Sequence, residues 1–131
     1  MSDQNIELLR GLYEAFGRGD VPTVLGAFDP QIEWNETEGM PYGGVYTGPD
    51  AIAENVFGPV TVDVADFAVK AEEFFAAGDE VVSLGRYTGR GAESGKELDV
   101  AFAHAWTVRD GKIARFRQYV DTVAFNAALA A

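Results

Sequence analysis

The dipeptide Asp110-Gly111 lies between two long runs of strand-forming residues, at 98–109 and 112–120. Asp-Gly is a strong signal for a two-residue β-hairpin, because both central positions of its turn need a positive φ. The pattern therefore predicts an antiparallel hairpin in which Arg109 pairs with Lys112. Strands of this length must cover one face with other parts of the chain to be stable.

Helical patterns precede this hairpin, and further strand patterns lead up to it. Apolar residues recur at helical spacing in 6–16, and Asp20 with Pro22 indicates the start of a second helix. The other expected elements are a strand at 32–36, a loop at 37–48, a helix at 50–57, strands at 67–76 and 81–88, a loop at 89–96 and a short helix from 122. Helices first and antiparallel strands afterwards predict an α+β fold, as one domain over residues 1–131.

Charge and composition exclude several classes of function. The 131 residues carry a formal net charge of −11, which disfavours binding to nucleic acid and to anionic membrane surfaces. The chain has no cysteine and a single histidine, so we expect no disulfide, no metal site and no cofactor. The polar start lacks the pattern of a signal peptide, and no apolar run could span a bilayer, so we expect a cytoplasmic protein.

Several short motifs then occur in a characteristic order along the chain. They are Tyr13-Glu14-Ala15-Phe16, Gly19-Asp20, Trp34, Tyr46-Thr47-Gly48-Pro49, the segment 104–113, and Gln118-Tyr119-Val120-Asp121. Through them nearly the whole chain resembles the SnoaL-like group of the nuclear transport factor two-like superfamily, which includes ketosteroid isomerases and limonene epoxide hydrolase. The resemblance implies a cone-shaped, curved antiparallel β-sheet wrapped around N-terminal helices, a fold also called cystatin-like. This fold serves enzymes and non-catalytic binders alike.

The two-residue turn also predicts which side chains of the hairpin share a face. One face would pair Ala105 with Phe116, Ala103 with Gln118, and Ala101 with Val120. The other would pair Trp106 with Arg115, His104 with Arg117, and Phe102 with Tyr119. The first set suits the concave wall of a pocket, and the bulky second set predicts a homodimer through the outer face of the sheet. A β-bulge in strand 98–109 would instead turn His104 inward.

His104 and Gln118 are the first candidates for chemistry. His104 could exchange protons near neutral pH or donate to a ligand carbonyl, and it occupies the position where SnoaL-like cyclases place a pocket histidine. The alternative is a cross-strand histidine paired with Arg117 or Tyr119. Gln118 lies where the family's polyketide cyclases carry an acid–base aspartate. Because an amide cannot exchange protons near pH 7, Gln118 would orient a substrate or a water molecule.

Two reactions of related families lack their residues in this chain. Ketosteroid isomerases need a carboxylate base, a tyrosine and a second carboxylic acid. The corresponding positions here are Trp34, Leu12 and Ala103, so that mechanism is not expected. No Arg-x-Asp pair occurs in the strands, so the epoxide hydrolase mechanism is not expected either.

Trp34 and Glu36 share one face of their strand. Glu36 could serve as a base at the mouth of a pocket, and a solvated glutamate is the alternative. The aromatic wall of the pocket would come from Trp34, with plain core packing as the alternative, and from Tyr13, Phe16, Tyr46 and Phe57.

Two charged residues have one functional and one structural interpretation each. Arg86 could hold an anionic ligand or extend to the surface. Asp121 could face the pocket or cap the terminal helix.

The sequence supports two functions of different classes. The first is cofactor-free acid–base chemistry on a hydrophobic small molecule, namely isomerisation, cyclisation, dehydration or hydrolysis, with His104, Gln118 and Glu36 as the catalytic candidates. The second is a non-catalytic ligand-binding or dimeric interaction module, which the missing ionisable groups at Trp34, Ala103 and Gln118 favour.

Overall fold

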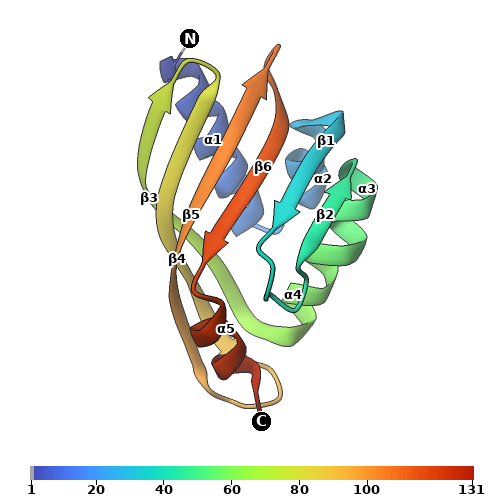
Figure 1. Cartoon of the computed structure of the whole chain (residues 1–131), viewed down its shortest axis with the longest axis vertical. Helices are drawn as coiled ribbons and strands as arrows, with labels where there is room; N and C mark the ends of the chain where they lie inside the picture. The colour runs from blue at the N-terminus through green and yellow to red at the C-terminus, as the bar shows by residue number, and fades with distance from the viewer. Residues whose placement is uncertain (1) are drawn as a thin grey trace.

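A curled, six-stranded sheet with the strand order β2-β1-β6-β5-β4-β3 forms the frame of the molecule. The computed structural model describes residues 2–131, and Figure 1 shows the helices gathered around this sheet. Helices α1 and α2 and the helical segment that follows β2 line the space on one side of the sheet, called the inner face below. Helix α5 lies beside β4 and β5 near one end of the sheet.

The elements follow one another in an α+β order, with most helices first. The helical elements are α1 (Ser2–Gly17), α2 (Val21–Gly26), α3 (Pro49–Ile52), the π-helical turn η1 (Ala53–Phe57), α4 (Gly58–Asp63) and α5 (Thr122–Leu129). The strands are β1 (Phe28–Glu36), β2 (Gly44–Thr47), β3 (Val64–Ala77), β4 (Glu80–Gly91), β5 (Glu97–Arg109) and β6 (Lys112–Val120).

The sheet is antiparallel except at one pair of strands. Strands β3 to β6 run antiparallel in chain order, and β1 pairs antiparallel with β2. Strand β1 runs parallel to β6, which the sequence did not predict. A parallel pair needs a long crossover connection, and here the connection includes several helices and four strands. The short edge strand β2 lies inside the predicted loop, because four residues are too few to show a periodic pattern.

The helical segment between β2 and β3 is longer than predicted and contains a π-helical turn. It runs from Pro49 to Asp63, whereas the sequence indicated 50–57. The cause lies at Pro59, which has no N–H to donate to the turn before it. At this point Gly58 N donates to the Ala53 carbonyl five residues back, which is the π-helical spacing. The chain thus continues as a helix across a residue that usually ends one.

The predicted hairpin is confirmed at its turn and wrong beyond it. Arg109 pairs with Lys112, and Asp110 and Gly111 have the positive φ values of 52° and 74° that this turn requires. After Val108 pairs with Ile113, the register shifts by one residue. The extra residue is Ala114 in β6, so this bulge lies in the strand opposite the one considered in the sequence.

The shift reverses the predicted faces of the two strands relative to each other. His104 lies opposite Gln118 instead of Arg117, and Trp106 lies opposite Phe116 instead of Arg115. The bulky residues of β5, namely Phe102, His104 and Trp106, are buried on the inner face together with Phe116 and Gln118. The alternating small residues Ala101, Ala103 and Ala105 face the other way. The predicted wall of alanines is therefore wrong.

The homodimer through the outer face of the sheet stays a prediction. The residues on that face differ from those expected from the sequence. It carries the three alanines and Tyr119, whose side chain is 56% exposed. Light scattering at micromolar concentration should give twice the monomer mass, and Tyr119→Glu should lower it by placing a charge in an apolar contact. A monomeric parent protein would contradict the prediction.

Gly85 should be intolerant of a side chain. It faces inward on β4, where a Cβ would collide with the Lys70 carbonyl oxygen and lie 2.7 Å from Phe102 Cζ. Gly85→Ala should lower the free energy of unfolding by about 1–3 kcal/mol, measured by urea denaturation. The control is Gly11→Ala, because nothing lies within 4 Å of a Cβ there and alanine favours the helix. Equal stability of the two variants would contradict this packing.

Candidate functional site

A small cavity lies between the helices and the inner face of the sheet. Its volume is about 60 Å³, whereas pockets for drug-sized ligands are typically about 300–1,000 Å³. All three predicted catalytic candidates line it, namely Glu36, His104 and Gln118. Four of the predicted wall residues line it too: Tyr13, Phe16, Trp34 and Phe57.

The wall of the cavity is largely aromatic and closely packed. The Trp34 ring stacks on Phe116 with a centroid distance of 3.8 Å, and Phe57 meets Trp34 edge-on at 5.5 Å. Trp106 packs against both Trp34 and Phe116. Such contacts hold flat rings at fixed angles.

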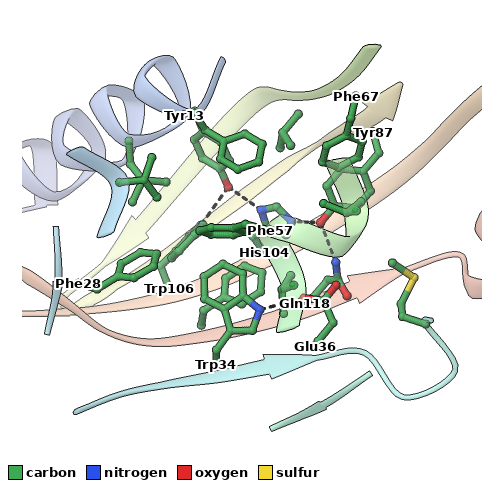
Figure 2. Close-up of a pocket in the computed structure, with 18 of the residues that line it drawn as sticks. Tyr13, Phe28, Trp34, Glu36, Phe57, Phe67, Tyr87, His104, Trp106 and Gln118 are labelled. Carbon is green, nitrogen blue, oxygen red and sulfur yellow. Dashed lines mark hydrogen bonds between the residues drawn. The ribbon is translucent and has the colours of Figure 1, made fainter. Parts of the chain in front are cut away.

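His104 lies on the inner face with both ring nitrogens engaged. Tyr13 Oη is 2.6 Å from Nδ1, and Tyr87 Oη is 2.6 Å from Nε2, so the imidazole links two tyrosines (Figure 2). The Phe102 ring stacks on it at 3.8 Å. Because complete burial penalises the charged imidazolium, the pKa of His104 is held well below its usual value. The alternative of a cross-strand pair with Arg117 or Tyr119 is wrong.

The neighbouring donors assign one tautomer to His104. Tyr87 Oη accepts a hydrogen bond from Gln118 Nε2 at 2.8 Å, so its own proton is free to be donated to His104 Nε2. We therefore assign the ring proton to Nδ1, which donates to Tyr13 Oη. Tyr13 in turn lies 2.6 Å from Ser83 Oγ and accepts from the Trp106 indole at 3.0 Å. In this arrangement Tyr13 donates to Ser83 Oγ, and the hydrogen bonds run from Gln118 through Tyr87, His104 and Tyr13 to Ser83.

Gln118 has a fixed amide orientation. Its Oε1 accepts from the backbone N–H of Thr37 at 3.0 Å, so its Nε2 must be the group that faces Tyr87. The backbone carbonyl of Gln118 also accepts from the Thr37 hydroxyl at 2.6 Å. The amide therefore presents N–H donors toward the interior of the cavity.

Among residues 2–131, Glu36 is the one carboxyl group that lines the cavity, and it is buried. Its side chain is 3% exposed, so the alternative of a solvated glutamate is wrong. Oε1 accepts a hydrogen bond from the Trp34 indole nitrogen at 2.9 Å. Burial raises the pKa of Glu36 to about 7, although the Trp34 indole and the Gln118 amide both favour the ionised form. A carboxyl with this pKa can give or take a proton near neutral pH.

The two tyrosines of the network stay neutral. Burial raises the pKa of Tyr13 and Tyr87 well above the usual value for a phenol. No lysine or arginine lines the cavity within residues 2–131. The interior of the site is therefore uncharged whenever Glu36 is protonated.

Three predicted site residues lie away from the cavity. Tyr46, on β2, donates from its hydroxyl to the Tyr42 carbonyl at 2.7 Å. Arg86 is partly exposed and forms an ion pair with Asp99, which raises the pKa of its guanidinium. Asp121 caps α5 by accepting from the Ala124 N–H at 2.9 Å. The structural interpretation thus describes Arg86 and Asp121.

Sequence reasoning missed Tyr87, Ser83 and Trp106. The signal for the first two was present, because odd-numbered residues of 81–87 share one face of a strand by simple alternation. Trp106 was assigned to the outer face because the register of the hairpin was taken to continue without a bulge.

Among residues 2–131, no three histidine, aspartate or glutamate side chains gather as a metal ion would require. None of the helices described here is long and apolar enough to cross a bilayer.

Comparisons with known proteins give a consistent family. A model described as "SnoaL-like domain" matches residues 9–116. An NTF2-like protein of Burkholderia thailandensis E264 superposes with a TM-score of 0.93 at 31% identity, over 100% of this chain and 99% of that one. TerC, crystallised with polyporic acid, superposes with a TM-score of 0.88 at 32% identity, over 96% of this chain and 98% of its own. An uncharacterised protein of Mycobacterium tuberculosis H37Rv is 28% identical over 93% of each chain.

The comparisons also bear on the predicted fold. A Xanthomonas campestris protein with a cystatin-like fold superposes with a TM-score of 0.79 at 24% identity, which speaks for the fold alone. With the NTF2-like match, it confirms the predicted NTF2-like, cystatin-like fold.

Glu36 should make stability fall as the pH rises. Its pKa is raised from 4.5 in the unfolded chain to about 7 when folded, so the folded state binds more protons between these values. The free energy of unfolding should therefore drop by roughly 3 kcal/mol between pH 4.5 and pH 8 on account of this group. Urea denaturation of Glu36→Gln should lack this part of the pH dependence. Glu93→Gln, at an exposed loop position, is the control and should follow the parent protein.

Proposed function

The chain belongs to the SnoaL-like domain family, and we propose that it binds a hydrophobic small molecule in the cavity and acts on it by cofactor-free acid–base chemistry. The proposal rests chiefly on Glu36, a buried carboxyl with a pKa of about 7 that lines an aromatic cavity. Burial is a well-known means of keeping a carboxylic acid protonated near neutral pH, so that it can act as a general acid.

Glu36 takes the proton-transfer role because the other candidates are otherwise engaged. Both nitrogens of His104 are bonded to tyrosine hydroxyls, and its pKa lies well below the usual value. In this proposal His104 is a positioning residue that holds Tyr13 and Tyr87. Gln118 orients the groups around Glu36 without exchanging a proton itself.

Entry of a ligand requires side chains of the wall to move. A cavity of about 60 Å³ is smaller than an aromatic ligand. Phe16 and Phe57 line the cavity and are partly exposed, with ring centroids 5.3 Å apart. Phe57 ends the π-helical turn, and such turns are frequent at functional sites. We infer that these two rings form the movable part of the wall.

The second candidate function is a binding module without catalysis. It is favoured by the hydrogen bonds that satisfy His104 and Gln118 within the protein, because such groups gain nothing from a ligand. This alternative shares the cavity with the first proposal and differs only in whether a proton moves.

Binding can be measured without knowing the natural ligand. The two tryptophans of the chain, Trp34 and Trp106, both line the cavity, so their fluorescence should change when it is occupied. A small hydrophobic ketone, 2-tetralone, is a suitable probe.

Proton transfer should then appear as exchange of carbon-bound hydrogen. Neutral Glu36 would donate to the carbonyl oxygen of bound 2-tetralone, and water would take a proton from the adjacent carbon. In deuterium oxide the protein should therefore speed deuteration of that carbon, followed by NMR, and Glu36→Gln should be about 100-fold slower or more. Binding of 2-tetralone without accelerated exchange would contradict the proposed catalysis and support the non-catalytic binding module. Equal exchange by the parent and Glu36→Gln would reject Glu36 as the acid.

A further inference from the structure

The surroundings of Glu36 specify the chemistry of the ligand more closely. We propose that the cavity selects uncharged molecules bearing a carbonyl oxygen, and that the neutral carboxyl of Glu36 recognises this oxygen by donating a hydrogen bond to it. The inference rests on the proposed function, because it assumes that the cavity binds a small molecule.

The first step is a mismatch between the neutral carboxyl and its neighbours. Trp34 presents an indole N–H to Glu36 Oε1, and an indole has no acceptor to offer in return. Gln118 also presents N–H groups, because Thr37 holds its oxygen. A protonated carboxyl carries one O–H that needs an acceptor, and a buried donor without one is costly. An oxygen of a ligand would supply that acceptor.

The second step is the absence of positive charge. No lysine or arginine lines the cavity in the described part of the chain, and the formal net charge of the protein is −11. A carboxylate or phosphate would lose its hydration in this cavity and gain no counter-charge. A ketone or aldehyde loses much less on entry. The cavity therefore discriminates by charge as well as by shape.

The third step concerns the other titratable groups around Glu36. Tyr87 of β4 and His104 of β5 face it across Gln118 of β6, as Figure 2 shows, and both remain neutral near pH 7. Tyr42, from the β1–β2 loop, interacts with the charge of Glu36 and donates to Asp63 Oδ2 of α4 at 2.9 Å. Burial raises the pKa of Tyr42 above the usual phenol value. Ionisation of Glu36 is thus the change inside the cavity near pH 7.

Three ligands with one ring system test the inference. These are 2-tetralone, tetralin and 1,2,3,4-tetrahydro-2-naphthoate, which carry a ketone, no polar group and a carboxylate. Isothermal titration calorimetry at pH 6 should give 2-tetralone about tenfold higher affinity than either of the others, as one hydrogen bond to a buried acid would provide. Equal affinity of tetralin, or of the naphthoate, would overturn the inference while the cavity remains a binding site. Failure of all three to bind would contradict the proposed function itself.

The pH dependence and two variants separate recognition by Glu36 from simple packing. The affinity of the parent protein for 2-tetralone should fall about tenfold from pH 6 to pH 8, as the neutral form of Glu36 is depleted. Glu36→Gln keeps an N–H donor at every pH, so it should bind 2-tetralone with the same affinity at both. Glu36→Leu should bind tetralin and 2-tetralone equally. An unchanged pH dependence in Glu36→Gln, or a retained ketone preference in Glu36→Leu, would reject the inference.

Discussion

The register between β5 and β6 determines which side chains share the cavity. The extra residue Ala114 shifts β6 by one position, and this shift brings Gln118 opposite His104 on the inner face. Without it, the inner side of β5 would face Arg115 and Arg117, whose charges would have to be buried. Because the side-chain period of a strand is two, a shift of one residue decides whether an uncharged network or two buried arginines face the inside of the sheet. The hydrogen bonds from Gln118 through Tyr87 to His104 depend on this register.

Burial favours the neutral form of Glu36, of His104 and of the two tyrosines of the network. It raises the pKa of Glu36 and of the two tyrosines, and it lowers that of His104. These shifts have one physical cause, which is that an ion loses more solvation than a neutral group when it leaves water. The network therefore holds protons in fixed positions, and only Glu36 has a pKa close enough to 7 to exchange one under ordinary conditions.

Local patterns in the sequence predicted much of the fold, but they did not predict the register between β5 and β6. The Asp110-Gly111 turn and the common face of Trp34 and Glu36 follow from turn chemistry and from strand alternation, which involve neighbours in sequence. The bulge at Ala114 has no such signature, since alanine suits either face and needs no special φ. Burial of Glu36 was equally hidden, because it depends on α4, the β1–β2 loop and β6 closing around β1. The resemblance to the family identified the fold but left the reacting group open.

Because Gln118 is an amide and cannot exchange a proton near neutral pH, it leaves proton exchange in this network to Glu36. A carboxylate at this position would accept hydrogen bonds from Thr37 and Tyr87, where the amide accepts from one and donates to the other. It would also place a second acid beside Glu36, and two adjacent carboxyl groups share protons and raise each other's pKa. The amide avoids both effects, because it has no charge and its direction is fixed by a backbone N–H. Its presence therefore concentrates proton exchange on Glu36, and it turns the remaining polar groups into a rigid support for that single acid.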